Sequence, residues 1–375
     1  MSRIAQLPTP CLLVDLDAVE RNTAAMSARV ARLGPRLRPH VKTHKCLEAA
    51  RLQVRGGFGG LTVSTLAEAR FFARAGFGDI TYAVPIAPAR MPEAIELARG
   101  MQRLSLLLDG ERALHELEAC AAAAGVRVPV FLKIDCGNHR AGVDPASPDA
   151  VAFAVRLARS ERLDFRGLLA HAGHAYACRD RREIAAAARE EREVTVGFAE
   201  RLRAEGVRVD EVSIGSTPTL SVAEDLTGVT EVRPGNYVFF DAFQAAIGSC
   251  ELGDAALSVL TTVIGSYPER GRLVVDAGAL ALSKDPGARH VDPAAGFGVL
   301  LTEEGEPVTG LRLAALSQEH GHLEAAPGTD LSGFGVGRRL RVVANHSCLT
   351  AALHERYRVL RGDRVVGEWR PVRGW

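Results

Sequence analysis

The sequence predicts an α/β fold, a (β/α)8 TIM barrel, followed by a second, mainly β domain. Two patterns predict the barrel: short apolar, β-branched runs alternate with alanine-rich amphipathic runs, and unusual polar residues follow the ends of the short runs. A change of texture after about Ala246 predicts the second domain, because the long alanine-rich runs stop there. We therefore expect a barrel over residues 1–246 and a β domain over residues 247–375.

Eight short apolar runs are candidate strands, the number that a barrel of this class contains. In chain order they are Leu37–Val41, Gly60–Ser64, Ile80–Val84, Leu104–Leu108, Val128–Ile134, Phe165–Ala170, Glu211–Ile214 and Thr230–Phe239. The helices expected between most of them are Lys45–Val54, Leu66–Ala75, Arg90–Arg99, Glu111–Ala124, Pro148–Ser160 and Arg181–Glu205. A further helix, Asp17–Leu33, precedes the first strand, with Asp15 or Asp17 as its cap.

The C-terminal part of the chain contains strand-like pieces separated by glycine, proline and acidic turns. These pieces are Ala256–Gly265, Arg272–Asp276, Gly298–Leu301, Leu340–Val343 and Arg358–Arg361. They predict the second, β-rich domain.

Composition narrows the class of protein. A net charge of +1 argues against nucleic acid or an anionic membrane as the main partner, and no apolar run approaches the length that spans a bilayer. The first ten residues lack the pattern of a signal peptide. Seven scattered cysteines with no C-x-x-C pair favour reduced thiols, so we expect a cytoplasmic protein.

Lys42 is a candidate catalytic and cofactor-binding residue. It lies where the first strand ends, between His40 and His44. In a polar pocket, a lysine whose amine has a lowered pKa is a nucleophile near neutral pH and can form a Schiff base with an aldehyde cofactor. A solvated surface lysine is the alternative.

Two glycine turns are candidate halves of a phosphate site. Gly215-Ser216-Thr217 follows the seventh strand, and Gly235-Asn236 lies on the eighth. Backbone N–H groups and hydroxyls in such turns approach anions closely, and barrel enzymes commonly hold phosphate after strands seven and eight. Ordinary turns are the alternative, but their expected adjacency favours a phosphate cradle.

Three other strand-end residues and one pair in the β domain complete the candidates. His171 is either a core histidine or a site residue, whereas Arg140 and Arg233 lie among apolar residues, where an arginine needs an acceptor. His346 and Cys348, at i and i+2, place two soft ligands on one face and suit zinc.

Together these segments resemble one family: the fold-type III pyridoxal phosphate enzymes of the D-serine dehydratase and D-threonine aldolase group, which is similar to the alanine racemase N-terminal barrel. The stretches that carry the resemblance are Leu7–Asn22, Arg38–Lys45, Gly167–Tyr176, Gly215–Thr219, Val232–Tyr237 and Asn345–Thr350.

The resemblance implies a role for each candidate. Lys42 resembles the Schiff-base lysine, His171 the residue packed on the pyridine ring, and Arg140 the arginine near the phenolic oxygen. Arg233 matches the position facing the pyridine nitrogen, and Tyr176 is similar to an active-site tyrosine. The resemblance also implies a phosphate cradle of Gly215, Ser216, Thr217, Gly235 and Asn236, with Tyr237 among the cofactor residues, and a metal pair of His346 and Cys348.

The cofactors implied are pyridoxal 5'-phosphate and Zn²⁺, with Mn²⁺ or another divalent ion as alternatives. Dehydratases of this group typically contain His-Ser-Cys, as at residues 346–348, whereas the aldolases contain His-Cys-Asp. The implied reaction converts a D-3-hydroxyamino acid, such as D-serine, D-threonine or 3-hydroxy-D-aspartate, to a 2-oxo acid and ammonia. The resemblance also leads us to expect a homodimer.

Three alternatives stay open at this point. They are a metal-dependent D-threonine aldolase, a non-catalytic pyridoxal phosphate-binding protein, and a racemase, for which Tyr267 or Tyr357 would have to supply an acid. The sequence departs from the family pattern at Ala344, where proline is common, and lacks a second tyrosine near Ala188 or Arg189.

Overall fold

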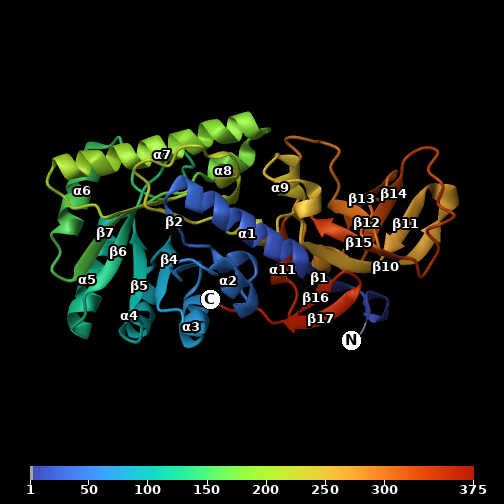
Figure 1. The fold of residues 1–375 in the computed structure, drawn as a ribbon, viewed down its shortest axis with the longest axis horizontal. Helices are drawn as coiled ribbons and strands as arrows, with labels where there is room; N and C mark the ends of the chain where they lie inside the picture. The colour runs from blue at the N-terminus through green and yellow to red at the C-terminus, as the bar shows by residue number, and fades with distance from the viewer. Residues whose placement is uncertain (1–2) are drawn as a thin grey trace. The chain divides into compact units, whose positions relative to one another are not determined.

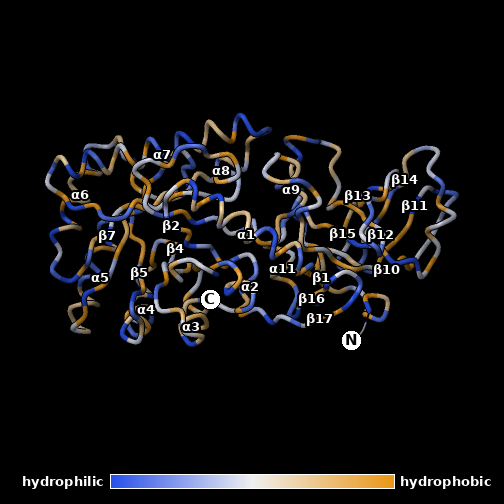
Figure 2. The backbone as a smooth tube through the Cα atoms, in the orientation of Figure 1, coloured by the Kyte–Doolittle hydropathy of each residue, from blue (hydrophilic) through white to orange (hydrophobic). Residues whose placement is uncertain are grey.

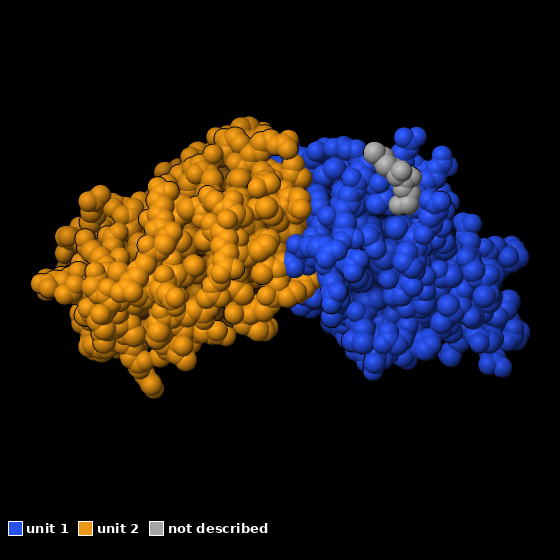
Figure 3. Space-filling model, turned by 90° about the horizontal axis from the view of Figure 1, so that it is seen from below, with its two compact units in different colours: residues 1–24, 236–371 blue, residues 25–235, 372–375 orange. Residues whose placement is uncertain are grey.

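The computed structural model describes residues 3–375, and the chain divides into two compact units. The barrel unit comprises Ala25–Gly235 and Val372–Trp375. The β unit comprises the N-terminal segment through Ala24 together with Asn236–Pro371 (Figure 3). These bounds differ from the boundary expected at residue 246, because the N-terminal segment contributes a strand to the β unit.

Eight parallel strands of the described residues form the barrel sheet, in the order β2-β9-β8-β7-β6-β5-β4-β3. They are β2 (Arg36–Leu37), β3 (Leu61–Val63), β4 (Asp79–Pro85), β5 (Arg103–Leu108), β6 (Val128–Lys133), β7 (Leu163–Leu169), β8 (Glu211–Ile214) and β9 (Glu231–Val232). A parallel bridge between His40 and Thr62 joins the two edges of the sheet. The eight strands expected from the sequence are confirmed, although β2 and β9 are shorter than expected.

Helices lie outside the barrel strands (Figure 1). They are α1 (Leu16–Leu33), α2 (Leu47–Gln53), α3 (Leu66–Arg74), α4 (Met91–Arg99), α5 (Glu111–Ala124), α6 (Pro148–Ala158), α7 (Arg181–Ala204) and α8 (Thr217–Val222), with the 3₁₀ turns η2 (Val41–Thr43), η3 (Pro88–Arg90) and η4 (Gly173–Ala177). The helices expected from α1 to α7 are all present. Asp15 caps α1, since its carboxylate accepts the Ala18 N–H at 3.0 Å.

Most residues of β5 are hydrophobic and buried, as the colouring of this strand in Figure 2 illustrates. At the N-terminal ends of the strands, however, buried charges pair. Arg38 is fully buried and donates to Glu231 Oε2 at 2.6 Å and to Asp79 Oδ1 at 2.7 Å. Glu211 accepts from Arg103 Nη1 at 2.8 Å. Because buried charges are tolerated only when paired, this network closes the end of the barrel away from the candidate site.

The β unit is built on a mostly antiparallel sheet in the order β13-β14-β11-β10-β1-β16-β17, with β15 pairing β10 and β12. Its strands are β1 (Cys11–Asp15), β10 (Leu257–Tyr267), β11 (Arg272–Val275), β12 (Gly298–Thr302), β13 (Leu311–Leu316), β14 (Gly321–Ala325), β15 (Arg339–Ala344), β16 (Tyr357–Arg361) and β17 (Arg364–Trp369). Its short helices are α9 (Ala242–Ala246), α10 (Ala279–Leu282) and α11 (Ser347–Ala352), with η1 (Ile4–Gln6), η5 (Asn236–Val238), η6 (Leu252–Asp254) and η7 (Pro268–Arg270). The five strands expected here are confirmed as β10, β11, β12, β15 and β16.

Candidate active site

Lys42 lies in η2, the turn that follows β2, and is partly buried. His40 caps this turn, with its Nδ1 accepting the Lys42 N–H at 3.4 Å. Burial, followed by the charges of Lys42 and Arg233, lowers the pKa of His40 well below its ordinary value. The ring therefore stays neutral at neutral pH, and Lys42 and Arg233 both lie close enough to act on it.

Arg233 follows β9 and is almost completely buried. Its Nη1 donates to Ser213 Oγ at 2.5 Å, its Nη2 donates to the Ala170 carbonyl, and Ser213 donates to Glu231 Oε1 at 2.7 Å. The acceptors that the sequence argument required are therefore present. Burial lowers the pKa of Arg233 to about 10, so the guanidinium remains protonated at neutral pH.

His171 lies in the loop after β7, and its ring centroid is 6.4 Å from that of Tyr176, which lies in η4. Burial, then the charges of Lys42 and Arg140, lowers the pKa of His171 well below its ordinary value. Arg140 lies in the loop after β6 and is exposed, so the expectation that it lies among apolar residues and needs an acceptor is wrong. The structure thus brings Lys42, His171, Arg233, Tyr176 and Arg140 into one region at the C-terminal ends of the barrel strands.

The two glycine turns follow neighbouring strands, as expected, since β8 pairs β9 with Ile214 opposite Val232. Gly215 has φ +95°, a conformation that L side chains rarely adopt. Ser216 then caps α8, and its Oγ accepts the Thr219 N–H at 3.3 Å. A Cβ on Gly235 would lie 2.7 Å from the His40 carbonyl oxygen, so only glycine fits beside the strand that leads to Lys42.

The side chain of Asn236 is engaged within the β unit, so only its main chain is left for the expected phosphate cradle. This residue begins the β unit, where its amide nitrogen donates to Asp241 Oδ2 at 2.7 Å and to Ser347 Oγ at 2.9 Å. The side chain is therefore committed to the segment that holds the metal pair. Its neighbour Tyr237 is fully buried.

His346 and Cys348 lie at the start of α11 and contact each other. His346 Nδ1 is 3.0 Å from Asp285 Oδ2, and the ring also hydrogen-bonds Cys348. Burial opposes the charged ring, but these bonds outweigh it and raise the pKa of His346 to about 11. Since Asp285 holds Nδ1, Nε2 is the ring nitrogen left for a metal ion.

Asp241 fixes the backbone around this pair. It is buried, and its carboxylate accepts the Ser347 N–H at 3.0 Å and the Gln244 N–H at 2.9 Å. Within residues 3–375, no group of three or more His, Cys, Asp or Glu side chains is arranged to hold a metal ion. The two soft ligands fit an open zinc site whose other positions are left to water or substrate.

The barrel residues fit pyridoxal phosphate in their chemistry. The set offers a primary amine, a protonated buried guanidinium, a neutral ring beside both, and a Gly-Ser-Thr turn at a strand end. The arrangement allows a cofactor with an aldehyde, a heteroaromatic ring and a phosphate to be held at these strand ends.

Sequence analysis missed four supporting residues: Ser213, Glu191, Asp241 and Asp285. Ser213 is an ordinary strand serine in sequence, and Glu191 lies in a helix rich in Glu and Arg, a pattern typical of a solvated face. Asp241 caps the short helix α9 and Asp285 lies in a loop, and aspartate is common in both settings. Their partners come from segments distant in the sequence, so no local signal pointed to them.

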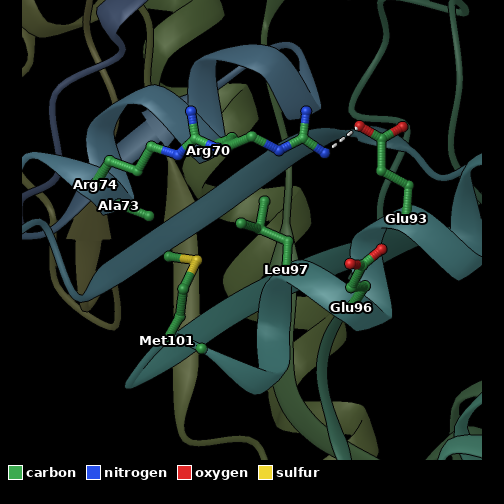
Figure 4. A pocket seen from close by; sticks show the side chains of 8 residues that line it. Arg70, Ala73, Arg74, Glu93, Glu96, Leu97 and Met101 are labelled. Atoms are coloured by element: carbon green, nitrogen blue, oxygen red, sulfur yellow. Dashed lines mark hydrogen bonds and ion pairs between the residues drawn. The ribbon is translucent and has the colours of Figure 1, made fainter.

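A surface hollow of about 350 Å³ lies elsewhere, between α3 and α4 (Figure 4). Arg70 and Glu93 form an ion pair of 2.8 Å at its edge, and Met101 and Leu97 line it. The hollow contains none of the candidate site residues.

Comparison with known proteins gives the family. Residues 14–242 match the model "Alanine racemase, N-terminal domain", and residues 256–360 match "Putative serine dehydratase domain". The chain is 39% identical over 399 residues to D-serine dehydratase of Dictyostelium discoideum, covering 99% of this chain and 98% of that protein. It is 40% identical to D-threo-3-hydroxyaspartate dehydratase of Delftia sp., covering 98% of each.

Solved structures agree. The Delftia dehydratase superposes with a TM-score of 0.95 over 100% of both chains, and a cysteine-to-alanine variant of it has been solved in a metal-free form. The D-threonine aldolase of Filomicrobium marinum is more distant, at 29% identity and a TM-score of 0.85 over 98% of this chain and 96% of that one. This chain therefore belongs to the fold-type III pyridoxal phosphate enzymes of the D-serine dehydratase and D-threonine aldolase family.

Proposed function

We propose that this protein is a lyase that uses pyridoxal phosphate and a divalent metal ion, zinc best of all, to convert a D-3-hydroxyamino acid to a 2-oxo acid and ammonia. The observation that carries the proposal is the His-Ser-Cys segment at residues 346–348, whose ring and thiol contact each other. The dehydratases named above, each similar over nearly the whole chain, support the reaction class. D-Serine, D-threonine and 3-hydroxy-D-aspartate are the candidate substrates.

Pyridoxal phosphate, when bound, supplies an aldehyde for amines and an electron-withdrawing ring that acidifies the substrate α-carbon. Lys42 would hold the cofactor through its side-chain amine and, when that amine is free, would be placed to take the proton from the substrate α-carbon. Arg233 stays protonated, because its pKa is about 10. A ring nitrogen beside such a guanidinium would remain unprotonated, so the ring would withdraw electrons from the substrate less strongly than a pyridinium ring. Three side chains are proposed to orient the cofactor ring: His171, Arg140 and Tyr176. The phosphate is proposed to be held by Gly215, Ser216, Thr217 and Gly235, with main-chain groups of Asn236 and Tyr237.

Hydroxide is by itself a poor leaving group, so its departure from the β-carbon would need a Lewis acid. Zinc, when bound, supplies a Lewis acid for the β-hydroxyl. His346 and Cys348 would hold it, Asp285 would fix the ring of His346, and Asp241 would fix the backbone at Ser347. The cysteine-to-alanine, metal-free structure of the Delftia dehydratase supports a link between a thiol and the metal in this family.

The net reaction balances without a further reactant. The substrate loses its α-proton and its β-hydroxyl, which together make water. The resulting double bond rearranges to an imine, which water then hydrolyses to the 2-oxo acid and ammonia. The overall change is therefore the loss of ammonia.

The deciding experiment is a product assay of the holoenzyme with the D- and L-enantiomers of serine, threonine and threo-3-hydroxyaspartate. We expect ammonia and a 2-oxo acid in equal amounts from D-substrates, no turnover of L-substrates, and loss of activity on treatment with a chelator. Borohydride reduction and peptide mapping of the same preparation should find the cofactor on Lys42.

Other products would select the alternatives. Glycine and an aldehyde from D-threonine would establish an aldolase, and turnover of L-serine equal to that of D-serine would overturn the substrate class. Binding of pyridoxal phosphate without any turnover would favour the non-catalytic alternative. The homodimer and the cytoplasmic location stay predictions, and no helix within residues 3–375 is long and apolar enough to cross a membrane.

A further inference from the structure

Glu191 is a buried carboxylate in the middle of α7. Its exposed fraction is 1%, whereas the side chain of its neighbour Glu190 is 57% exposed and Glu193 lies at the surface. A buried carboxylate is costly unless its oxygens are hydrogen-bonded or paired with a cation. The hydrogen-bond partners of the Glu191 carboxylate therefore indicate its structural role.

A single oxygen of Glu191 accepts two backbone N–H groups from two different loops. Glu191 Oε1 is 2.8 Å from the Ala172 nitrogen and 3.1 Å from the Gly215 nitrogen. Ala172 directly follows His171, and Gly215 directly precedes Ser216. One carboxylate thus joins the loop after β7 to the loop after β8, and both loops carry candidate cofactor residues.

Both N–H groups lie at sharp turns of the backbone. Ala172 has φ −74° and ψ 73°, and the Gly173 N–H donates to the His171 carbonyl at 2.9 Å, which is an inverse γ-turn. Gly215 has φ +95°, and a Cβ there would lie 2.4 Å from the Leu220 side chain. At these turns the N–H groups of Ala172 and Gly215 do not take part in strand pairing. Glu191 therefore accepts hydrogen bonds from two backbone donors that would otherwise have no partner.

Two cations near Glu191 offer a second way in which it could act. Lys133 and Arg233 are both nearly buried, and burial lowers the pKa of Lys133 to about 8 and that of Arg233 to about 10. The charge of Glu191 opposes both shifts. A role through charge and a role through hydrogen-bond geometry lead to different expectations for a glutamine variant.

We propose that Glu191 is the positioning residue of the cofactor site and acts through geometry: its carboxylate oxygen sets the loop of His171 and the loop of Ser216 and Thr217 relative to each other. This inference rests on the proposed function, because it assumes that those loops hold pyridoxal phosphate. Glu191 acts through the two backbones and need not touch the cofactor.

The test compares Glu191→Gln, Glu191→Ala and Glu191→Asp with the matched surface variant Glu193→Ala. Apoprotein of each is titrated with pyridoxal phosphate, and affinity and the visible circular dichroism of the bound cofactor are recorded. Because both N–H groups bind one oxygen, glutamine keeps both bonds, whereas aspartate is one methylene too short to reach both. We expect Ala and Asp to weaken binding by about tenfold or more and to change the dichroism, while Gln and Glu193→Ala stay within about threefold of wild type.

Each result decides the matter. Wild-type affinity in Glu191→Ala would overturn the proposal, and a glutamine variant as weak as the alanine variant would overturn the geometric account in favour of charge. If Glu191→Ala does not fold, the comparison of Gln with Asp still decides, because both retain polar oxygens. If wild-type apoprotein does not bind pyridoxal phosphate, the proposed function itself is wrong.

Discussion

At the scale of single residues, the candidate site depends on side chains whose chemistry is set by one or two neighbours. Arg233 remains a cation in the barrel interior because the charges of Glu231 and Glu191 partly offset its burial, while Ser213 and the Ala170 carbonyl accept its hydrogen bonds. Asp285 holds Nδ1 of the His346 ring and so leaves Nε2 for a ligand. In both cases, the supporting residue decides which atom remains for a ligand.

The metal pair gives the residue-scale prediction. Cys348→Ala removes one of two proposed soft ligands, so metal content should fall to near zero after dialysis, and dehydration should fall by at least about a hundredfold. Cofactor absorbance should stay at the wild-type level, since Lys42 and the glycine turns belong to the barrel unit. Elemental analysis, absorbance and the product assay measure the three quantities.

Cys250→Ala is the matched control, because Cys250 is another partly buried thiol of the β unit and should retain metal and activity. Full dehydratase activity of Cys348→Ala in metal-free buffer would show that the thiol has no part in the reaction. The site would then have to be sought without this residue.

The site residues also show what a sequence can and cannot reveal. Lys42, His171 and the Gly215 turn were predictable because barrel chemistry lies at strand ends, and the strands have a local pattern. Asn236 was expected in the phosphate cradle, and the structure shows that its side-chain amide donates to Asp241 and Ser347. Ser347 is 111 residues further along the chain than Asn236, and contacts of that kind leave no periodic signal.

At the scale of elements, the segment that carries Lys42 is held by a buried histidine. His44 follows η2 and precedes α2, its Nδ1 accepts the Cys46 N–H at 3.0 Å, and its Nε2 lies 2.9 Å from Gln53 Oε1. With Nδ1 as acceptor, the ring must be neutral and donate from Nε2. One neutral ring thus joins the turn of Lys42 to the helix that follows it.

This arrangement predicts how stability depends on pH. Burial lowers the pKa of His44 from 6.5 to about 4, against the smaller opposing effects of Gln53 and Cys46. Because the unfolded chain binds a proton more readily, stability is lost as pH falls from 6.5 through about 4, by roughly 1 kcal/mol per pH unit. His44→Gln should reduce the dependence of unfolding free energy on pH by the equivalent of about one bound proton. Urea unfolding curves measured across this pH range test it.

His115→Gln provides the comparison, because His115 is exposed on α5. Its slope should match that of the wild type. An unchanged slope in His44→Gln would mean that the ring is not held neutral, whatever the effect of the substitution on overall stability.

At the scale of the whole molecule, neither compact unit is a continuous piece of chain. Strand β1 lies in the middle of the β-unit sheet, where it pairs with β10 antiparallel and with β16 parallel. Its partners begin at Leu257 and Tyr357, so local pattern could not assign Cys11–Asp15 to the second domain. Strands β13, β14 and β17 were also missed, because each is only five or six residues long and polar or charged residues interrupt its apolar pattern.

Because β1 is a central strand, the stability of the β unit should depend on the N-terminal segment, although most of that unit comes from the C-terminal third of the chain. Leu12 is fully buried and lies opposite Val259 on one side and Tyr357 on the other. Leu12→Ala should therefore cost the β unit about 2–5 kcal/mol of unfolding free energy. Val366→Ala, on β17 of the same sheet but 39% exposed, should cost less than about 1 kcal/mol.

Fluorescence can assign the loss to the correct unit. The chain has 2 tryptophans, and Trp375 is 81% exposed, so Trp375→Phe leaves Trp369 as the single reporter. Trp369 pairs with Tyr357, the residue opposite Leu12, and so reports on the sheet that contains β1. In that background, Leu12→Ala should lower the denaturant midpoint of the Trp369 transition well below that of Val366→Ala. Equal midpoints would mean that the packing of Leu12 does not stabilise this sheet, because a central strand cannot lose its packing without loosening the strands on both sides.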